Sequence, residues 1–461
     1  MAVASKPVLP SSNKDYAPLD AEPDRRKALK LTPGRLVFLC VFLALVPLGA
    51  LHKPLAHHYR RVSDHVCKRH MLVEQRAWMI LAGTPLIDGH VDFAETLRES
   101  YVNLIDNSEW ARSFENGTLR GQVDLARLRA GQSGGAFWSV YAPCPTKDDD
   151  FSDENLAASV QYTLDQIDVT ARAFDAYPDD FAMRLDSSDA VDAFEAGKLI
   201  SPLGIEGLHQ IGNSAANLRL FHDLGVRYAT LTHNCHNKFA DAALVGDPPR
   251  KAEPHWGGVS PLGRKLVDEM NRIGMIVDLS HVSEDTMVDV LGGRDDWHGS
   301  KAPVIFSHSS AWSICPHPRN VKDHVLQLVQ ERNSLVMVNV NPGFISCVDV
   351  GDGSGLPKED RENATMDQVV KHITHIGNLI GYDHVGIGTD FDGITEVPTD
   401  FEDVAKYPDL VAALLRAGVS DSDAAKVVGG NVLRVWKDVD AVSAKMKAEG
   451  APVMEDTVKG S

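Results

Sequence analysis

Histidines and carboxylates recur in this chain at the ends of short apolar runs. In the first run, His90 and Asp92 are separated by one residue, so in an extended strand both side chains point to the same side. Residues of the same kind close five further runs: Glu206, His233, His281, His308 and Asp390. Imidazole nitrogens and carboxylate oxygens bind divalent metals or transfer protons. Their common position predicts one shared site for metal binding and acid–base chemistry.

The donor types indicate which metal such a site would hold. Nitrogen and oxygen ligands without a thiolate suit a hard-to-borderline divalent ion, so zinc is the first expectation and manganese, cobalt or iron are alternatives. A catalytic zinc ion usually takes three protein ligands, and the strand-end candidates exceed that number. The excess favours two metal ions that share a carboxylate.

Eight short apolar runs, rich in β-branched residues, predict strands that are buried on both faces. They span residues 85–90, 135–141, 203–206, 228–233, 275–281, 303–308, 334–339 and 384–390. Helical patterns lie between them, at residues 153–177, 217–224, 261–272, 283–291, 321–332 and 365–380. This alternation predicts an α/β fold, a (β/α)8 TIM-like barrel whose C-terminal strand ends converge at one mouth and gather the candidate residues. A doubly wound open sheet is the alternative, although no glycine-rich phosphate turn follows the first strand.

The chain also resembles the membrane dipeptidase (renal dipeptidase) family of zinc peptidases over about residues 71–445. The resemblance rests on the stretches IDGHVD, GGAFWSVYAPC, GIEGLH, RYATLTHNC, DLSHVS, PVIFSHSSA, RNV, SLVMVN and GTDFDG. The family's first motif reads HND, whereas Val91 stands between His90 and Asp92 here. Because Val91 points away from both ligands, we expect the ligands to be retained and the pocket rim to differ.

The resemblance implies a dipeptidase that holds two zinc ions. His90 and Asp92 would bind one ion, His281 and His308 would bind the other, and Glu206 would bridge them. A hydroxide shared by the two ions would be the nucleophile, because a bound metal lowers the pKa of water towards neutrality.

The resemblance also assigns roles around a dipeptide substrate. Asp390 would transfer a proton to the leaving amine, and His233 would stabilise the oxyanion of the tetrahedral intermediate. Arg319 would bind the free carboxylate of the dipeptide, which a guanidinium can do through two parallel hydrogen bonds. The segment 238–256 resembles an active-site loop whose composition could set substrate preference.

Three other functions remain open at this point. The same chemistry could act on a dedicated biosynthetic or glutathione-derived conjugate, which this sequence does not distinguish from a free dipeptide. A non-catalytic ectodomain on the same barrel would be expected to have lost ligands, and all of them are present. A general amidohydrolase typically opens with HxH, whereas this chain has HxD.

Four cysteines lie in the predicted barrel: Cys144, Cys235, Cys315 and Cys347. An even number permits two disulfides in an oxidising compartment, but four cysteines allow three pairings. The resemblance implies the pairs Cys144–Cys235 and Cys315–Cys347. Cys40 and Cys67 are left over, and Cys67 could form an intermolecular bridge.

The first 70 residues predict a membrane attachment. Residues 1–35 are rich in proline, serine and charge and predict a disordered basic tail. The uncharged apolar run 36–51 would rise about 24 Å as a helix, slightly less than the bilayer core of about 30 Å. We interpret it as a transmembrane signal anchor in the lipid bilayer, with residues 52–70 as a linker. A cleaved signal peptide and a secreted protein are the alternative.

The topology of that anchor is inferred from the rest of the chain. Basic residues balance on the two sides of the run, so the positive-inside rule does not decide the orientation. The cysteines and the glycosylation sequons at Asn116 and Asn363 favour a single-pass type II protein with the barrel on the extracellular or lumenal side. Residues 446–461 predict a C-terminal tail without the apolar segment of a lipid-anchor signal.

Charge limits the partners. The chain has 46 Lys and Arg against 64 Asp and Glu, a net charge of −18, yet residues 1–70 hold 12 basic and only 5 acidic residues. The acidic surplus therefore lies in the predicted barrel, where it would repel phosphate backbones and excludes nucleic acid as a partner. The family resemblance also indicates a possible homodimer.

Overall fold

The structure, a computed structural model, describes residues 71–147, 149–294 and 296–456. The predicted tail 1–35, signal anchor 36–51 and linker 52–70 lie outside the described residues and stay predictions. Among the residues that are described, no helix is both long enough and apolar enough to cross a membrane.

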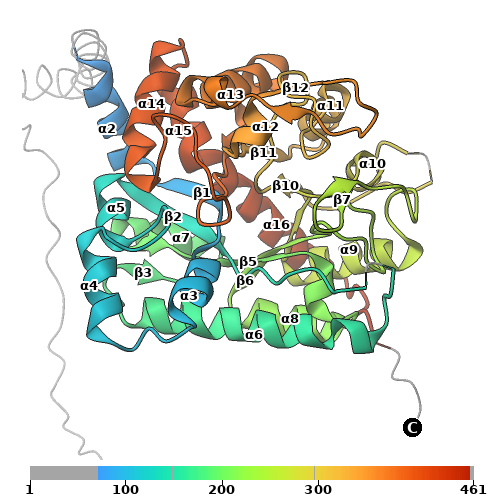
Figure 1. The fold of residues 1–461 in the computed structure, drawn as a ribbon. Helices are drawn as coiled ribbons and strands as arrows, with labels where there is room; N and C mark the ends of the chain where they lie inside the picture. Colours follow the sequence, from blue (N-terminus) through green and yellow to red (C-terminus); the bar gives the residue numbers. More distant parts are fainter. Residues whose placement is uncertain (1–70, 148, 295, 457–461) are drawn as a thin grey trace, which may run out of the picture. The chain divides into compact units, whose positions relative to one another are not determined.

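Parallel strands form the centre of the unit that begins at Met71 (Figure 1). Each strand pairs with the next in the order β1 (Leu86–Val91), β2 (Ser133–Ser139), β5 (Leu203–Glu206), β6 (Val226–Thr230), β9 (Ile276–Asp278), β10 (Ile305–Phe306), β11 (Leu335–Val338) and β14 (Val385–Ile387). The predicted α/β fold with a mostly parallel sheet is confirmed.

A bridge between Val91 and Phe391 links the end of β14 back to β1. Around it, the Asp390 N–H donates to the His90 carbonyl at 3.0 Å and the Asp92 N–H donates to the Phe391 carbonyl at 2.8 Å. This closing contact is what the predicted barrel requires, and an open sheet would lack it.

Short strands lie outside this ring. β4 (Leu199–Ile200) pairs with β2 and with β3 (Phe181–Ala182), while β7 (Leu244–Val245) with β8 (Arg250–Lys251) and β12 (Cys347–Val348) with β13 (Lys358–Glu359) form antiparallel pairs in loops. None was predicted, because a strand of two residues is too short to show an apolar period.

The six predicted helical stretches are confirmed as α6 (Asp153–Asp175), α8 (Ala215–Asp223), α9 (Pro261–Ile273), α10 (Glu284–Val290), α11 (Asp323–Glu331) and α13 (Met366–Ile380). Hydroxyls cap five of them by accepting a hydrogen bond from a first-turn N–H: Ser152, Ser214, Ser260, Ser283 and Thr365. These caps explain where the helices begin.

The remaining helices are α2 (Val73–Gly83), α3 (Phe93–Tyr101), α4 (Ser108–Asn116), α5 (Leu125–Ala130), α7 (Ser187–Glu195), α12 (Pro342–Ile345), α14 (Tyr407–Arg416), α15 (Asp421–Ala425) and α16 (Asn431–Ala448). Single turns are η1 (Leu208–Ile211), η2 (Arg361–Asn363), η3 (Tyr382–His384), η4 (Val404–Lys406) and the π-helical η5 (Lys426–Gly430). Figure 1 shows the helices surrounding the strands.

Helix α16 covers one end of the strand ring. Its apolar side chains share a buried cluster with Ile276, Ile305 and Leu335, the first residues of β9, β10 and β11. The ring of Trp436 lies 5.5 Å from that of Phe137 in β2. Because α16 fills the end where the strands begin, the opposite end, where they finish, is left for a site.

The C-terminal segment packs on the same unit. Helix α16 continues to Ala448, past the predicted tail boundary at residue 446. Beyond it, the carboxylate of Asp456 accepts hydrogen bonds from the N–H groups of Ala215 and Ala216 at 2.8 and 3.0 Å. Residues 449–456 therefore contribute a carboxylate to the start of α8, where it complements the helix dipole.

Two disulfides join loops beyond the strand ends. Cys144 pairs with Cys235 and Cys315 pairs with Cys347, so the pairing implied by the family resemblance is confirmed. Cys40 and Cys67 lie outside the described residues.

Removal of the Trp436 side chain tests the role of α16. We expect Trp436→Ala to lower the free energy of unfolding by about 3–5 kcal/mol, because the side chain is fully buried and leaves a cavity. Trp78 on α2 is 58% exposed, so Trp78→Ala is the control and should change stability by no more than about 0.5 kcal/mol. Urea denaturation of both variants gives the comparison, and equal losses would contradict this role.

Candidate metal centre

The predicted site residues lie together at the C-terminal ends of the ring strands. His90 belongs to β1 and Glu206 is the last residue of β5. The others stand two or three residues beyond their strands: His233 after β6, His281 after β9, His308 after β10 and Asp390 after β14. The sequence analysis therefore placed the ends of these four strands two or three residues too far along the chain. His281 and Asp390 adopt left-handed backbone angles (φ 65° and 69°), which take the chain out of the strand.

The carboxylate of Glu206 lies at the centre of the group. Its Oε1 is 2.8 Å from Nε2 of His281, 3.4 Å from Nε2 of His308 and 3.6 Å from Nε2 of His90. The nearest nitrogen of His233 lies 3.9 Å away. Histidines from four strand ends thus surround one buried carboxylate oxygen.

Two imidazole nitrogens face each other beside Glu206. Nε2 of His281 lies 2.9 Å from Nε2 of His308. On the opposite edges of the rings, Nδ1 of His281 faces Oδ1 of Asn234 at 3.0 Å, and Nδ1 of His308 faces Oγ of Ser307 at 2.9 Å. Ser307 donates its own hydroxyl proton to Asp278, so it accepts from His308. Both Nε2 atoms then carry lone pairs, and a cation between them removes the repulsion.

A second pair of donors lies at the end of β1. Nε2 of His90 is 3.0 Å from Oδ2 of Asp92, and Nδ1 of His90 is 2.7 Å from the hydroxyl of Tyr228. The other oxygen of Asp92, Oδ1, is buried and has no hydrogen-bond partner among the described residues. A buried carboxylate oxygen without a partner is costly, and a metal ligand bond would satisfy it.

Electrostatics at these residues fit metal binding. Burial, with the nearby Arg319, holds the pKa of His281 well below its usual range, and burial and His90 do the same for His308. Burial raises the pKa of Glu206. Burial alone lowers the pKa of His90, but Asp92 and Glu206 outweigh it and raise that pKa to about 10. The neutral imidazoles of His281 and His308 can donate lone pairs to a divalent ion, and the raised pKa of His90 shows that the carboxylates around it favour positive charge.

Two buried aspartates form hydrogen bonds with residues at or next to the ligands, and the sequence analysis did not single them out. Asp88 accepts hydrogen bonds from the N–H of His90 at 3.0 Å and the hydroxyl of Tyr407 at 2.7 Å. Asp278 accepts from the N–H of Ser307 at 2.7 Å. Each aspartate lies in a strand and precedes a ligand histidine by two or three residues, and this spacing was the available signal.

A cavity of about 620 Å³ opens beside the centre. Asp92, Glu206, His281 and Asp390 line it together with Arg319. Arg319 is 3% exposed, lies over the ring of Phe344 at 5.1 Å, and has no partner among the described residues at Nε or Nη2. A buried guanidinium with unsatisfied donors that lines a cavity is a site for an anionic group such as a carboxylate.

Asp390 lies between the metal ligands and the cavity. Its Oδ2 accepts a hydrogen bond from Nδ2 of Asn339 at 3.0 Å, and its Oδ1 is 3.9 Å from Nε2 of His90. Burial raises the pKa of Asp390 to about 7, which is suitable for a group that takes and gives a proton near neutral pH. The Asn339 contact was not predicted.

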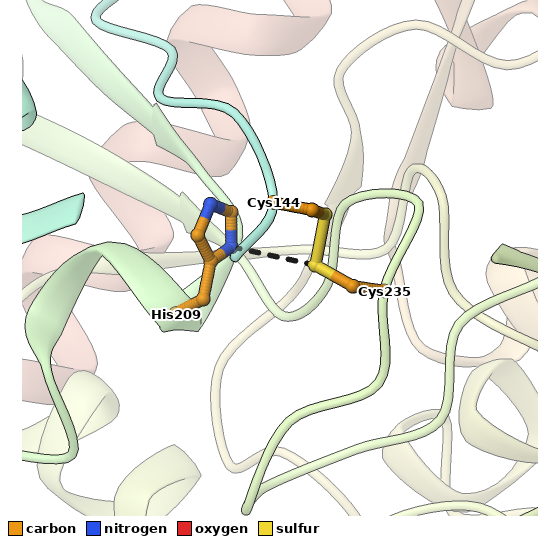
Figure 2. A group of neighbouring side chains, drawn as sticks. All are labelled: Cys144, His209 and Cys235. Atoms are coloured by element: carbon orange, nitrogen blue, oxygen red, sulfur yellow. Dashed lines mark hydrogen bonds between the residues drawn. A yellow bond between two sulfur atoms is a disulfide. The ribbon is translucent and has the colours of Figure 1, made fainter. Parts of the chain in front are cut away.

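His233 is placed by its neighbours on the β2 and β6 loops. Nδ1 of His233 lies 3.7 Å from Sγ of Cys144, and its ring centroid is 5.0 Å from that of Tyr141. Figure 2 shows the Cys144–Cys235 disulfide with His209 beside it. Nε2 of His209 donates to the carbonyl of Ala142 at 2.8 Å, which ties η1 to the loop that carries Cys144. The disulfide thus restrains the loops on both sides of His233.

The sequon residues lie on the surface. Asn116 is the exposed last residue of α4, and Asn363 is the exposed last residue of η2. Glycosylation at either position stays a prediction.

Comparison with known proteins agrees with this geometry. The model of the family described as membrane dipeptidase (peptidase family M19) matches residues 74–450. Dipeptidase tcpJ of Claviceps purpurea is 44% identical over 371 residues, which cover 80% of this chain and 80% of that protein. Dipeptidase aclJ of Aspergillus oryzae is 44% identical over 387 residues, which cover 82% and 83% respectively.

A solved structure supports the same relationship. The metallopeptidase of Rhodobacter sphaeroides, liganded with a phosphinate mimic of the dipeptide L-Ala-D-Ala, is similar with a TM-score of 0.64 and 25% identity. The match covers 77% of this chain and 99% of that one. Since the family model extends over most of the chain, this chain belongs to the membrane dipeptidase family, peptidase family M19, and is a metallo-dipeptidase.

Proposed function

We propose that this protein hydrolyses free dipeptides with two zinc ions at the strand ends. The observation that carries the proposal is the arrangement of Glu206 beside the facing Nε2 atoms of His281 and His308. Arg319, whose Nε and Nη2 have no hydrogen-bond partner among the described residues, lines the same cavity. Such a cavity holds cations at one point and an anionic substrate group at another.

The donors fall into two sets around Glu206. His90 and Asp92 would hold one ion, His281 and His308 would hold the other, and Glu206 would contact both. Nε2 of His90 lies 3.0 Å from Oδ2 of Asp92 and Nε2 of His281 lies 2.9 Å from Nε2 of His308, and these two short distances support this division. Bound zinc ions would supply an activated water molecule and polarise the scissile carbonyl group.

The side chains of Arg319, His233 and Asp390 then position the substrate and transfer a proton. Arg319 binds the carboxylate of the dipeptide and fixes the scissile bond beside the ligands. His233 donates a hydrogen bond to the oxygen that becomes negatively charged, which agrees with its place in the cavity wall. Asp390, held by Asn339, takes a proton from the attacking water and delivers it to the nitrogen of the leaving amine as the C–N bond breaks.

We further propose that the barrel faces the extracellular space or the secretory lumen as a type II membrane protein. Two disulfides support an oxidising compartment. The anchor itself, residues 36–51, lies outside the described residues.

Replacement of Asp390 tests the proton-transfer role. Asp390→Asn keeps the shape of the side chain and tolerates the left-handed backbone. We expect kcat to fall by at least about 100-fold, because the amide cannot transfer the proton. Zinc content should stay normal, and Asp175→Asn, an exposed change on α6, should leave kcat unchanged. Turnover of Asp390→Asn within about threefold of the wild type would remove this role.

Arg319 is tested with a free dipeptide and its C-terminal amide. The wild-type protein should hydrolyse the free dipeptide about 10 to 100 times more efficiently, since a charge-assisted hydrogen bond contributes about 1.5–3 kcal/mol. In Arg319→Gln the two substrates should become nearly equal, mainly through a higher KM for the free dipeptide. Efficient hydrolysis of the amide by the wild type would leave a hydrolase without carboxylate recognition at Arg319.

A further inference from the structure

One wall of the cavity carries charge that the proposed reaction does not use. Glu95 and Glu99 of α3 line it, together with Asp392 on the loop after β14. The described residues that line the cavity include two arginines, Arg120 and Arg319, and no lysine; Arg319 lies over the ring of Phe344. The wall therefore holds three carboxylates against one guanidinium.

Glu95 is held in place by uncharged partners. The hydroxyl of Tyr162 donates to its Oε2 at 3.0 Å, and Nε2 of Gln166 donates to the same oxygen at 3.0 Å. Arg98 stacks over the ring of Tyr162 at 3.6 Å and donates to Oε1 of Gln166 at 3.2 Å. These contacts orient the carboxylate towards a fixed position without pairing it with a cation.

The wall is electrostatically unfavourable without a ligand. Burial raises the pKa of Glu95 to about 7; the charges of Asp92 and Glu99 act in the same direction, and the Tyr162 hydrogen bond and the charge of Arg98 oppose them without cancelling the rise. Oδ2 of Asp392 is buried and has no hydrogen-bond partner among the described residues. A positively charged group next to these carboxylates would relieve their repulsion and their lost solvation.

The position of Arg319 fixes which end of a substrate would meet this wall. Arg319 takes the carboxylate, and the metal ligands take the scissile bond. The amino-terminal residue of the dipeptide, which carries the free amine, would then lie against the wall on α3. Arg98 and Arg127 act on Glu95 and Asp392 from a distance, but they are ion-paired with Asp165 and Asp124 respectively. Among the described residues, Arg120 forms no ion pair with the carboxylates of this wall. The α-ammonium group of the substrate therefore leaves carboxylates in this wall for a further cation. The volume of about 620 Å³ is ample for a long side chain.

We propose that this wall selects dipeptides whose amino-terminal residue has a basic side chain, lysine or arginine. The inference rests on the proposed dipeptidase function. An uncharged side chain of equal length would fill the same space without relieving the repulsion, and an acidic one would increase it.

The test compares lysyl-alanine with norleucyl-alanine, which differ in the terminal amine, using the zinc-loaded full chain. We expect kcat/KM to be at least about tenfold higher for lysyl-alanine, which corresponds to about 1.4 kcal/mol. In the double variant Glu95→Gln with Glu99→Gln the ratio should fall to within about threefold of one. The single variant Glu99→Gln changes an exposed side chain and should lower the ratio by about threefold. Glu331→Gln, an exposed change at the end of α11, is the matched control and should keep the wild-type ratio.

The outcomes separate this inference from the function on which it rests. Equal hydrolysis of both substrates by the wild type overturns the inference and leaves the dipeptidase intact. Hydrolysis of neither, by folded protein that holds two zinc ions, overturns the proposed function itself. A full lysine preference in both variants also overturns the inference, and so does the loss of a metal ion from the double variant, because the wall would then be a metal site.

Discussion

Nε2 of His281 and Nε2 of His308 lie 2.9 Å apart beside the buried carboxylate of Glu206, and with a lone pair on each nitrogen a cation between them would be strongly stabilised. Most of what surrounds these atoms serves to keep them there. Ser307 and Asn234 fix the ring tautomers of His308 and His281. Without a metal ion, burying these polar atoms costs free energy. Bonds to a metal ion would offset that cost.

The residues that stabilise the fold and the residues of the metal centre lie at opposite ends of the strand ring. At one end of the strand ring, α16 and the first residues of the strands form an apolar cluster. At the other end, Asp88 and Asp278 tie neighbouring strand ends together through hydrogen bonds to backbone and hydroxyl groups. The ligands therefore lie in the ring strands or within three residues of a strand end, whereas Arg319 and the acidic wall lie on loops and on α3. Such a division lets substrate preference change while the metal ligands stay in place.

Much of the fold and of the centre could be predicted from the sequence, because apolar runs buried on both faces and polar residues at their ends leave a visible pattern. The exact ends could not, since His233, His281 and His308 leave the strand hydrogen bonds before the apolar run finishes. The sequence analysis missed Asp88 and Asp278, because the role of an aspartate inside an apolar strand depends on its hydrogen-bond partners. One of these partners, Tyr407, lies far along the chain. The role of Glu95 depends on which face of α3 meets the cavity, and that follows from tertiary packing alone.

The central claim is that Glu206 lies between two metal ions. The most direct measurement is anomalous diffraction at the zinc absorption edge from crystals of the zinc-loaded protein. The account predicts two peaks per chain, one beside His90 and Asp92 and one between His281 and His308, with Glu206 in contact with both. A single peak, or two peaks that do not share Glu206, would contradict it.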